Sequence, residues 1–246
     1  MSTKYFVISL KKSVERRASI SSILSSQGVD FEIFDATYGK EMTPEEQALF
    51  HSGSDPVLNM KAGRRVSIGG SLSPAEKGCA LSHLRLYQHI LDQGLEHAVI
   101  MEDDVQPHPD AFEAVARVDC IKEPWDVINF SSDYGIRSLP GARKYFFRED
   151  KNFYFQRLGM RNDVLDAIFN TRRIVLFNMM YIVTASACRK LLEIGYPVRL
   201  PADYLNGIIA WNNLKTFAVF PHNHFYAEPV FESTIGDRAD HKITRL

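Results

Sequence analysis

The sequence predicts an α/β fold, in which strands alternate with helices around a sheet that begins as a parallel pair. The first observation is the opening of the chain, where an apolar strand at 5–10, a helix with apolar residues at 14, 20, 23 and 24, and a strand at 30–34 follow one another. Such a β-α-β unit forms a parallel pair with a right-handed crossover. The second is the segment 98–105, Ala-Val-Ile-Met-Glu-Asp-Asp-Val, whose apolar half is typical of a buried strand.

The composition is that of an ordinary globular protein. The 246 residues are 45% hydrophobic and 24% charged, and this length suffices for one large α/β domain, predicted over 1–246. The formal net charge of -1 gives no reason to expect nucleic-acid binding. Cys79, Cys120 and Cys188 are too few and too widely spaced for a disulfide framework or a CxxC zinc site. The N-terminus lacks the long apolar region of a signal peptide, so we expect a cytoplasmic protein.

Three carboxylates, Glu102, Asp103 and Asp104, follow the strand of the 98–105 segment directly. Unpaired carboxylates are too costly to bury, so they should emerge where the strand ends, which in open α/β sheets is the edge that binds ligands. The alternative is an acidic loop on a solvated face. If the strand geometry persists, Glu102 and Asp104 point to one side and Asp103 to the other. Such an oxygen pair suits Mg²⁺ or Mn²⁺, which can bridge a diphosphate. Neither GxGxxG nor GxxxxGK[ST] occurs.

A long helix is predicted between the second strand and the acids. Ser73 as N-cap, Pro74 at the first helical position and Glu76 as the partner of Ser73 form a capping box, and Gly94 ends the helix. The helix carries His83, which is either a structural hydrogen-bonding residue or a functional one. The preceding segment, 39–70, is predicted to be irregular apart from a short helix that starts at 43–46. Its part 61–70 either closes over an anionic ligand or forms a solvated surface loop.

The second half of the chain continues the alternation. The predicted elements are a helix at 111–118 capped by Asp110, a strand at 125–130 followed by Asp133, a strand at 180–184, a helix at 185–194, a helix from about 203 to 211 with Asp203 in the N-cap position, and strands at 214–220 and 224–231. Between 137 and 173 lies a basic and aromatic excursion. Its cations suit phosphate or an anionic membrane surface and its aromatic rings suit sugars; alternatively the rings pack inside and the cations are solvated.

Several of these pieces together resemble glycosyltransferase family 25, the bacterial lipooligosaccharide galactosyltransferases with their collagen-modifying relatives. The pieces, in the order in which the family has them, are Val7-Ile8-Ser9-Leu10 with Arg16-Arg17, the stretch 72–83 that ends in Gly-Cys-Ala-Leu-Ser-His, Val99 to Val105, Tyr181 to Leu192, and Pro201-Ala202-Asp203. The Gly-Cys-Ala-Leu-Ser-His and Glu-Asp-Asp pieces are specific in combination, although each alone would be weak.

The resemblance implies a GT-A-type, Rossmann-like fold with a mixed, mostly parallel sheet, a UDP-sugar donor and Mn²⁺ or Mg²⁺. The metal ligands it implies are Asp104, Glu102 and either His222 or His224. The donor-binding residues it implies are Ser9, Leu10, Arg16, Asp35, Ala36, Gly78, His83, Glu102 and Asp103. Inverting transfer needs a base on the acceptor hydroxyl, for which Asp203 is the first candidate and Asp133 the second.

The function predicted on this basis is metal-dependent, inverting transfer of a hexose, galactose above all, from a UDP-sugar to a lipooligosaccharide core acceptor. Such a β-galactosyltransferase would work in the cytoplasm, with peripheral contact to the anionic inner face of the membrane. The alternatives are a UDP-glucose-dependent glucosyltransferase, a Mg²⁺-dependent phosphoesterase, and a non-catalytic glycan-binding protein on a transferase fold. A phosphoesterase would need more acidic or His ligands near the three acids than the sequence offers.

Overall fold

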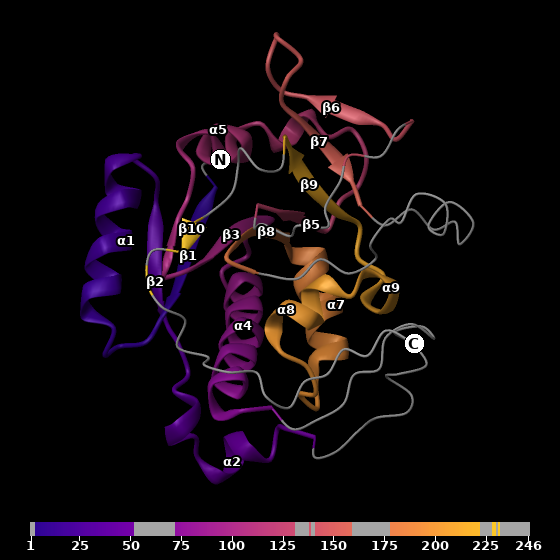
Figure 1. Ribbon diagram of the computed structural model, residues 1–246. Helices are drawn as coiled ribbons and strands as arrows, with labels where there is room; N and C mark the ends of the chain where they lie inside the picture. Colours follow the sequence, from indigo (N-terminus) through magenta and orange to yellow (C-terminus); the bar gives the residue numbers. More distant parts are fainter. Residues whose placement is uncertain are drawn as a thin grey trace.

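A computed structural model shows one central sheet with helices on both faces (Figure 1), and it describes residues 3–51, 72–130, 138, 141–158, 178–221, 228–229 and 231. The eight strands lie in the order β2-β1-β3-β8-β5-β9-β7-β6. Their bounds are β1 Lys4–Ser9, β2 Phe31–Asp35, β3 His97–Glu102, β5 Val127–Asn129, β6 Lys144–Phe146, β7 Tyr154–Arg157, β8 Met180–Thr184 and β9 Thr216–Phe220. A separate short pair joins β4 (Val105–Gln106) to β10 (Glu228–Pro229).

The strand directions confirm the predicted mixed sheet, in which most strands run the same way. β1 is parallel to both β2 and β3, and β5 is parallel to β9. Only β8 and β7 run against the other strands of this sheet, since β8 is antiparallel to β3 and β5 while β7 is antiparallel to β9 and β6. Insertion of β8 between β3 and β5 has a consequence for the site, because it places Tyr181 beside the strand that delivers the acids.

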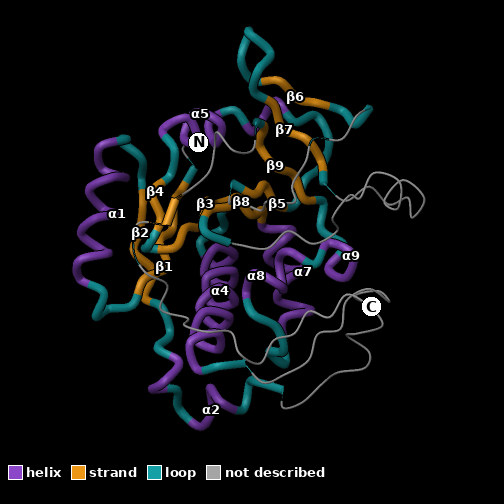
Figure 2. The backbone as a smooth tube through the Cα atoms, viewed as in Figure 1, coloured by secondary structure: helices purple, strands orange, loops and turns teal. Residues whose placement is uncertain are grey.

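Helices cover the two faces of the sheet, as Figures 1 and 2 show. The helices are α1 Val14–Ser26, α2 Pro44–Gln47, α4 Pro74–Asp92, α5 Pro109–Ala116, α7 Ala185–Gly195, α8 Ala202–Gly207 and α9 Ile209–Asn212, with short 3-10 turns η1 Gly39–Glu41 and η2 Val118–Cys120. Residues of α1 and α5 form one core cluster with the sheet, while α4, α7 and α8 belong to the other. None of the helices in the described ranges is long and apolar enough to cross a membrane.

Burial on both faces explains why the interior of the first strand, from Tyr5 to Ile8, is apolar at every position. Tyr5 and Val7 belong to the core under α1 and α5, whereas Phe6 and Ile8 belong to the core under α4 and α7. Successive side chains of a strand point to opposite faces, and a strand covered on both faces therefore needs apolar residues at every position. The polar residues of β1 stand at its two ends, Lys4 and Ser9.

The predicted start of α4 and the predicted glycine ends of α1 and α4 agree with the structure. Ser73 Oγ accepts a hydrogen bond from the Glu76 N–H, and the Glu76 carboxylate accepts one from the Ser73 N–H, which completes the capping box. A second capping box starts α2 at Thr43. Gly28 and Gly94 adopt φ values of +65° and +66°, the left-handed conformation that ends a helix at little cost for glycine.

Four local predictions about the helices are wrong. Val14 is 69% exposed at the first position of α1, and the buried residues of this helix are Ile20 and Leu24 in its second half. The cap of α5 is His108 rather than Asp110, because Pro109 occupies the first helical position. Asp203 is the second residue of α8 and Pro201 is its N-cap, and the predicted single helix is divided into α8 and α9 at Ile208.

The described part of the 137–173 excursion is packed against the rest of the protein. Tyr145 and Phe155 are buried in the core under α5. Arg148 is bound by the carboxylates of Asp110 and Glu113. This favours the interpretation in which the aromatic rings pack inside. Residues 159–177, like the 61–70 loop, lie outside the described residues, and contact with an anionic membrane stays a prediction.

Candidate active site

A pocket of about 310 Å³ opens where β1 and β3 end. Strand register explains its position, since Ile8 lies opposite Glu102 and Ser9 opposite Asp35, so that the polar ends of three parallel strands meet at one edge. The predicted site residues that line the pocket are Ser9, Leu10, Arg16, Ala36, His83, Glu102, Asp103 and Asp104. The residues that the sequence singled out at the strand ends therefore lie together around one pocket.

Arg16 is the cation that two of the three acids share. Its Nη1 lies 3.1 Å from Asp103 Oδ1 and 3.3 Å from Asp104 Oδ2, and all three side chains are mostly buried, with 15%, 10% and 14% exposed. Ser9 Oγ also donates to Asp103. Burial raises the pKa of Asp104 above its usual value, and the nearby Arg16 only partly opposes this. The ring of Phe231 lies 5.4 Å from the Arg16 guanidinium.

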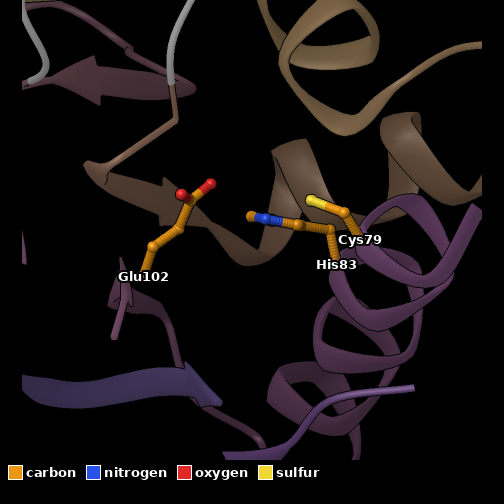
Figure 3. Close-up of side chains that lie close together, drawn as sticks. All are labelled: Cys79, His83 and Glu102. Atoms are coloured by element: carbon orange, nitrogen blue, oxygen red, sulfur yellow. The ribbon is translucent and has the colours of Figure 1, made fainter. Parts of the chain in front are cut away.

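The expected alternation of Glu102, Asp103 and Asp104 across a strand does not hold. β3 ends at Glu102, and Asp103 and Asp104 form a turn before β4 begins, which lets both reach Arg16. Glu102 faces α4 instead, where Cys79 and His83 lie one helical turn apart (Figure 3). One ligand atom from each of these three side chains lies within 4.8 Å of the other two.

The two ring nitrogens of His83 differ in their surroundings. Its side chain is fully buried, and Nδ1 shares a 2.7 Å hydrogen bond with the Tyr181 hydroxyl. That hydroxyl is 2.8 Å from the Tyr87 hydroxyl, which in turn is hydrogen-bonded to the Asn206 side chain. Burial lowers the pKa of His83 to about 3, so the ring is neutral at physiological pH. Nε2 has no hydrogen-bond partner among the described residues.

Asp35 and Asp203 lie elsewhere. Asp35 does not line the pocket; it holds the guanidinium of Arg17 at 2.8 Å, and this hydrogen bond lowers the pKa of the Asp35 carboxyl. Arg17 also donates to the Ser9 carbonyl, so the pair fixes the end of β1. Asp203 is 7% exposed in α8, which packs on α4 and α7, and it is not among the residues around the pocket. Asp133, His222 and His224 lie outside the described residues.

Sequence reasoning missed several residues that line the pocket, namely Lys12, Tyr38, Lys40, Cys79 and Ser82. Lys12 Nζ lies 3.4 Å from the centre of the Tyr38 ring, so the two pack together at the pocket wall. Cys79 could have been found from spacing alone. It precedes His83 by four residues on a predicted helix, and residues four apart share one helix face.

Gly78 lets α4 approach the loop that forms one wall of the pocket. A Cβ at this position would lie 2.6 Å from the Thr37 carbonyl oxygen and 2.8 Å from the Gly39 nitrogen. Both are backbone atoms and cannot rotate away. Gly78 therefore acts through packing in this structure, and its predicted place in donor binding is indirect, since it does not itself line the pocket.

We expect Gly78→Ala to lower the free energy of unfolding by roughly 1–3 kcal/mol, because α4 and the 37–39 loop must separate to admit the methyl group. Urea unfolding followed by circular dichroism measures this. Gln88→Ala, an exposed change on the same helix, is the control and should stay within about 0.5 kcal/mol of the parent. Equal effects for the two variants would contradict the packing role.

The acid trio has the chemistry of a site for a hard divalent cation. Three carboxylates line one pocket, and two of them already converge on a positively charged group, Arg16. Mg²⁺ and Mn²⁺ prefer oxygen ligands and are commonly held by one or two carboxylates together with substrate phosphates. The residues present therefore fit such an ion.

Comparison with known proteins gives a consistent result. The family described as glycosyltransferase family 25 (LPS biosynthesis protein) matches residues 2–206. The lacto-N-neotetraose biosynthesis glycosyltransferase LgtE of Neisseria gonorrhoeae is 32% identical over 145 residues, which are 59% of this chain and 46% of LgtE. LgtB of the same organism is 32% identical over 120 residues, 49% of this chain and 39% of LgtB.

A third relative bears a different description. The probable inactive glycosyltransferase 25 family member 3 of Rattus norvegicus is 30% identical over 147 residues, which are 55% of this chain and 25% of the rat protein. Each match to these relatives spans less than half of the relative's own length. The family match, by contrast, extends from the first strand to α8 and includes every described residue of the pocket wall named above. This chain belongs to glycosyltransferase family 25.

Proposed function

We propose that the protein transfers galactose from UDP-galactose to a lipooligosaccharide core acceptor, with inversion at the anomeric carbon and with Mn²⁺ as cofactor. The observation that carries the proposal is the pocket itself, in which three carboxylates and Arg16 meet at the carboxyl ends of β1 and β3 in a family 25 chain. The descriptions of LgtE and LgtB, both glycosyltransferases of lacto-N-neotetraose biosynthesis, support an oligosaccharide acceptor.

Asp104 and Glu102 would hold the metal, with His222 or His224 as a further ligand. When bound, the ion would stabilise the negative charge that develops on the departing diphosphate. Lys12 and Lys40 line the same pocket and add positive charge for the phosphates. The ends of β1 and β2, with Ser9, Leu10 and Ala36 in the pocket wall and Asp35 beside them, would hold the uridine. Arg16 holds Asp103 and Asp104 in place through its two ion pairs.

Asp203 is the proposed base and Asp133 the second candidate. Inversion requires that the acceptor hydroxyl attack from the side opposite the diphosphate, so the base must lie away from the acids. Asp203 lies in α8, which packs on α4, and it is not among the residues that line the pocket of the acids. We expect Asp203→Asn to lower the rate of transfer while leaving the affinity for UDP-galactose unchanged. Equilibrium titration of the donor and single-turnover transfer measure the two quantities separately.

A donor screen tests the proposal most directly. The protein is heated with Mn²⁺ and UDP-galactose, UDP-glucose or, as a control, GDP-mannose. A donor at 100 times its Kd stabilises the fold by about 2.7 kcal/mol, which raises the melting temperature. We expect this increase for UDP-galactose, together with Mn²⁺-dependent gain of one hexose by the acceptor in mass spectra. Proton NMR of the new linkage should show the inverted anomer.

Other outcomes would identify the alternatives. Stabilisation and transfer with UDP-glucose would replace galactose by glucose. Hydrolysis of the donor at the same rate with and without acceptor would favour a phosphoesterase. Acceptor binding without turnover of any sugar nucleotide would favour a non-catalytic glycan-binding protein, a second candidate to which the description of the rat relative as probably inactive gives weight.

A further inference from the structure

We propose that Cys79, His83 and Glu102 form a binding site for a transition metal ion of the zinc class. The site shares Glu102 with the proposed manganese site but adds a sulfur and a nitrogen ligand from α4. This proposal concerns metal binding alone, so its test does not depend on whether the protein transfers a sugar.

Helix and strand geometry bring the three side chains together. Cys79 and His83 are four residues apart on α4 and lie on the same helix face, and Glu102 is the last residue of β3 (Figure 3). Ligand atoms around a tetrahedral zinc ion, at about 2.0–2.3 Å from the metal, lie roughly 3.3–3.8 Å from one another. The present atoms lie within 4.8 Å of one another. Because Cys79 and Glu102 are partly exposed, small rotations of these two side chains can close the difference.

His83 is the observation that points to a ligand. Its side chain is fully buried, it extends toward Glu102 (Figure 3), and its Nε2 has no hydrogen-bond partner among the described residues. A buried polar atom without a partner costs roughly 1–3 kcal/mol, and such atoms are rare in folded proteins. A metal ion in the pocket would satisfy this nitrogen, and a neutral imidazole is the form that binds metal.

The other ring nitrogen of His83, Nδ1, has the kind of hydrogen bond that histidine ligands of metal ions usually make. Ligating histidines almost always donate their second ring N–H to a fixed acceptor, which sets the tautomer and the ring orientation. Here Nδ1–H can donate to Tyr181, Tyr181 to Tyr87, and Tyr87 to Asn206 Oδ1, at 2.7, 2.8 and 3.0 Å. With this direction of donation, Nε2 carries the lone pair of the ring and is the nitrogen that can bind a metal ion.

The ligand set selects the class of metal. A thiolate, an imidazole and a carboxylate suit Zn²⁺ or Co²⁺, whereas Mn²⁺ and Mg²⁺ prefer oxygen ligands. Two anionic ligands and one neutral ligand also balance the charge of a divalent ion, as a partly buried site requires. Three protein ligands leave a fourth position open toward the pocket, because all three residues line it.

Titration of the chelator-treated full chain with Co²⁺ tests the site, because a cobalt–thiolate bond gives a charge-transfer absorption that oxygen and nitrogen ligands do not give. We expect one equivalent to produce this band and the visible bands of tetrahedral cobalt, with Zn²⁺ displacing the cobalt and a 100-fold excess of Mn²⁺ failing to do so. Cys79→Ser should abolish the sulfur band. Cys120→Ser, which changes a partly exposed thiol near Tyr145, is the matched control and should retain it.

Two further variants separate ligation from folding. Glu102→Gln should weaken Zn²⁺ binding at least tenfold, and Tyr181→Phe, which removes the acceptor for His83 Nδ1–H, should weaken it about 10–100-fold. Circular dichroism reports whether each variant is folded. The proposal would be overturned by a cobalt spectrum without a sulfur band, by a band that survives in Cys79→Ser, or by equal zinc affinity in the parent and the folded Glu102→Gln variant.

Discussion

Replacing Asp104 by Asn is expected to lower the transfer rate by about 100-fold or more while the fold becomes more stable at neutral pH. Loss of the carboxylate that we propose as a metal ligand would remove several kcal/mol of charge stabilisation from the transition state, and each 1.36 kcal/mol is a factor of ten in rate. The gain in stability follows from burial. Because the pKa of Asp104 is raised in the folded protein, its ionised form is less favourable there than in the unfolded chain.

The pH dependence has a definite sign. A carboxyl group with a raised pKa in the folded state binds its proton more tightly in that state, so the folded protein loses stability as pH rises from the ordinary Asp value through the raised one. Asn carries no charge and escapes this loss. The stability difference between Asp104→Asn and the parent should therefore be largest near pH 7 and should shrink toward acidic pH, where Asp104 is protonated.

Initial rates of Mn²⁺-dependent UDP release and thermal unfolding between pH 4 and pH 8 measure the two effects. Asp30→Asn is the matched control, since Asp30 is also in an ion pair, with Lys4, but lies exposed at the opposite end of β2. It should leave the rate unchanged. A fully active Asp104→Asn enzyme would remove Asp104 from the metal site, and a loss of stability near pH 7 would contradict the argument from burial.

The sheet edge that forms the site could be predicted from the sequence because its signals are local. When an apolar strand ends in carboxylates, placing these carboxylates at the edge of the sheet avoids the free-energy cost of burying unpaired charges. The capping box at Ser73 likewise needs only four consecutive residues, and α4 begins where the box predicts. Helix spacing within α4 likewise explains why Ala80, Leu84 and Tyr87 share one face and are buried in the core.

The contacts that define the site could not be predicted, because they join distant parts of the chain. Arg16 reaches Asp103 across 87 residues, and His83 reaches Tyr181 across 98. The turn at Asp103 and Asp104 contains neither Gly nor Pro, the residues that most clearly indicate a turn. The sequence pattern therefore predicts a strand that continues beyond Glu102. The cap of α8 was misplaced for a related reason, because a carboxylate in the first turn of a helix and one at its N-cap are equally favourable near the helix dipole.

The second large effect is expected for Arg16→Gln, which removes the charge shared by Asp103 and Asp104. Breaking a mostly buried ion pair from one side leaves an uncompensated charge and costs roughly 3 kcal/mol of stability. The loss should diminish at acidic pH, where protonation of Asp104 removes the repulsion. Mn²⁺ should recover part of the lost stability, because a divalent ion between the carboxylates can take the place of the guanidinium.

Thermal unfolding with and without Mn²⁺ separates this explanation from a simple packing defect. If the carboxylates form a cation site, the increase in melting temperature caused by Mn²⁺ should be larger in Arg16→Gln than in the parent, where the ion competes with Arg16. Arg85→Gln, which breaks an exposed ion pair with Glu46, should lose at most about 1 kcal/mol and should respond to Mn²⁺ as the parent does. An Arg16→Gln protein that is destabilised equally at all pH values and insensitive to Mn²⁺ would mean that Arg16 stabilises the fold through packing alone. The acids would then have no special affinity for a second cation.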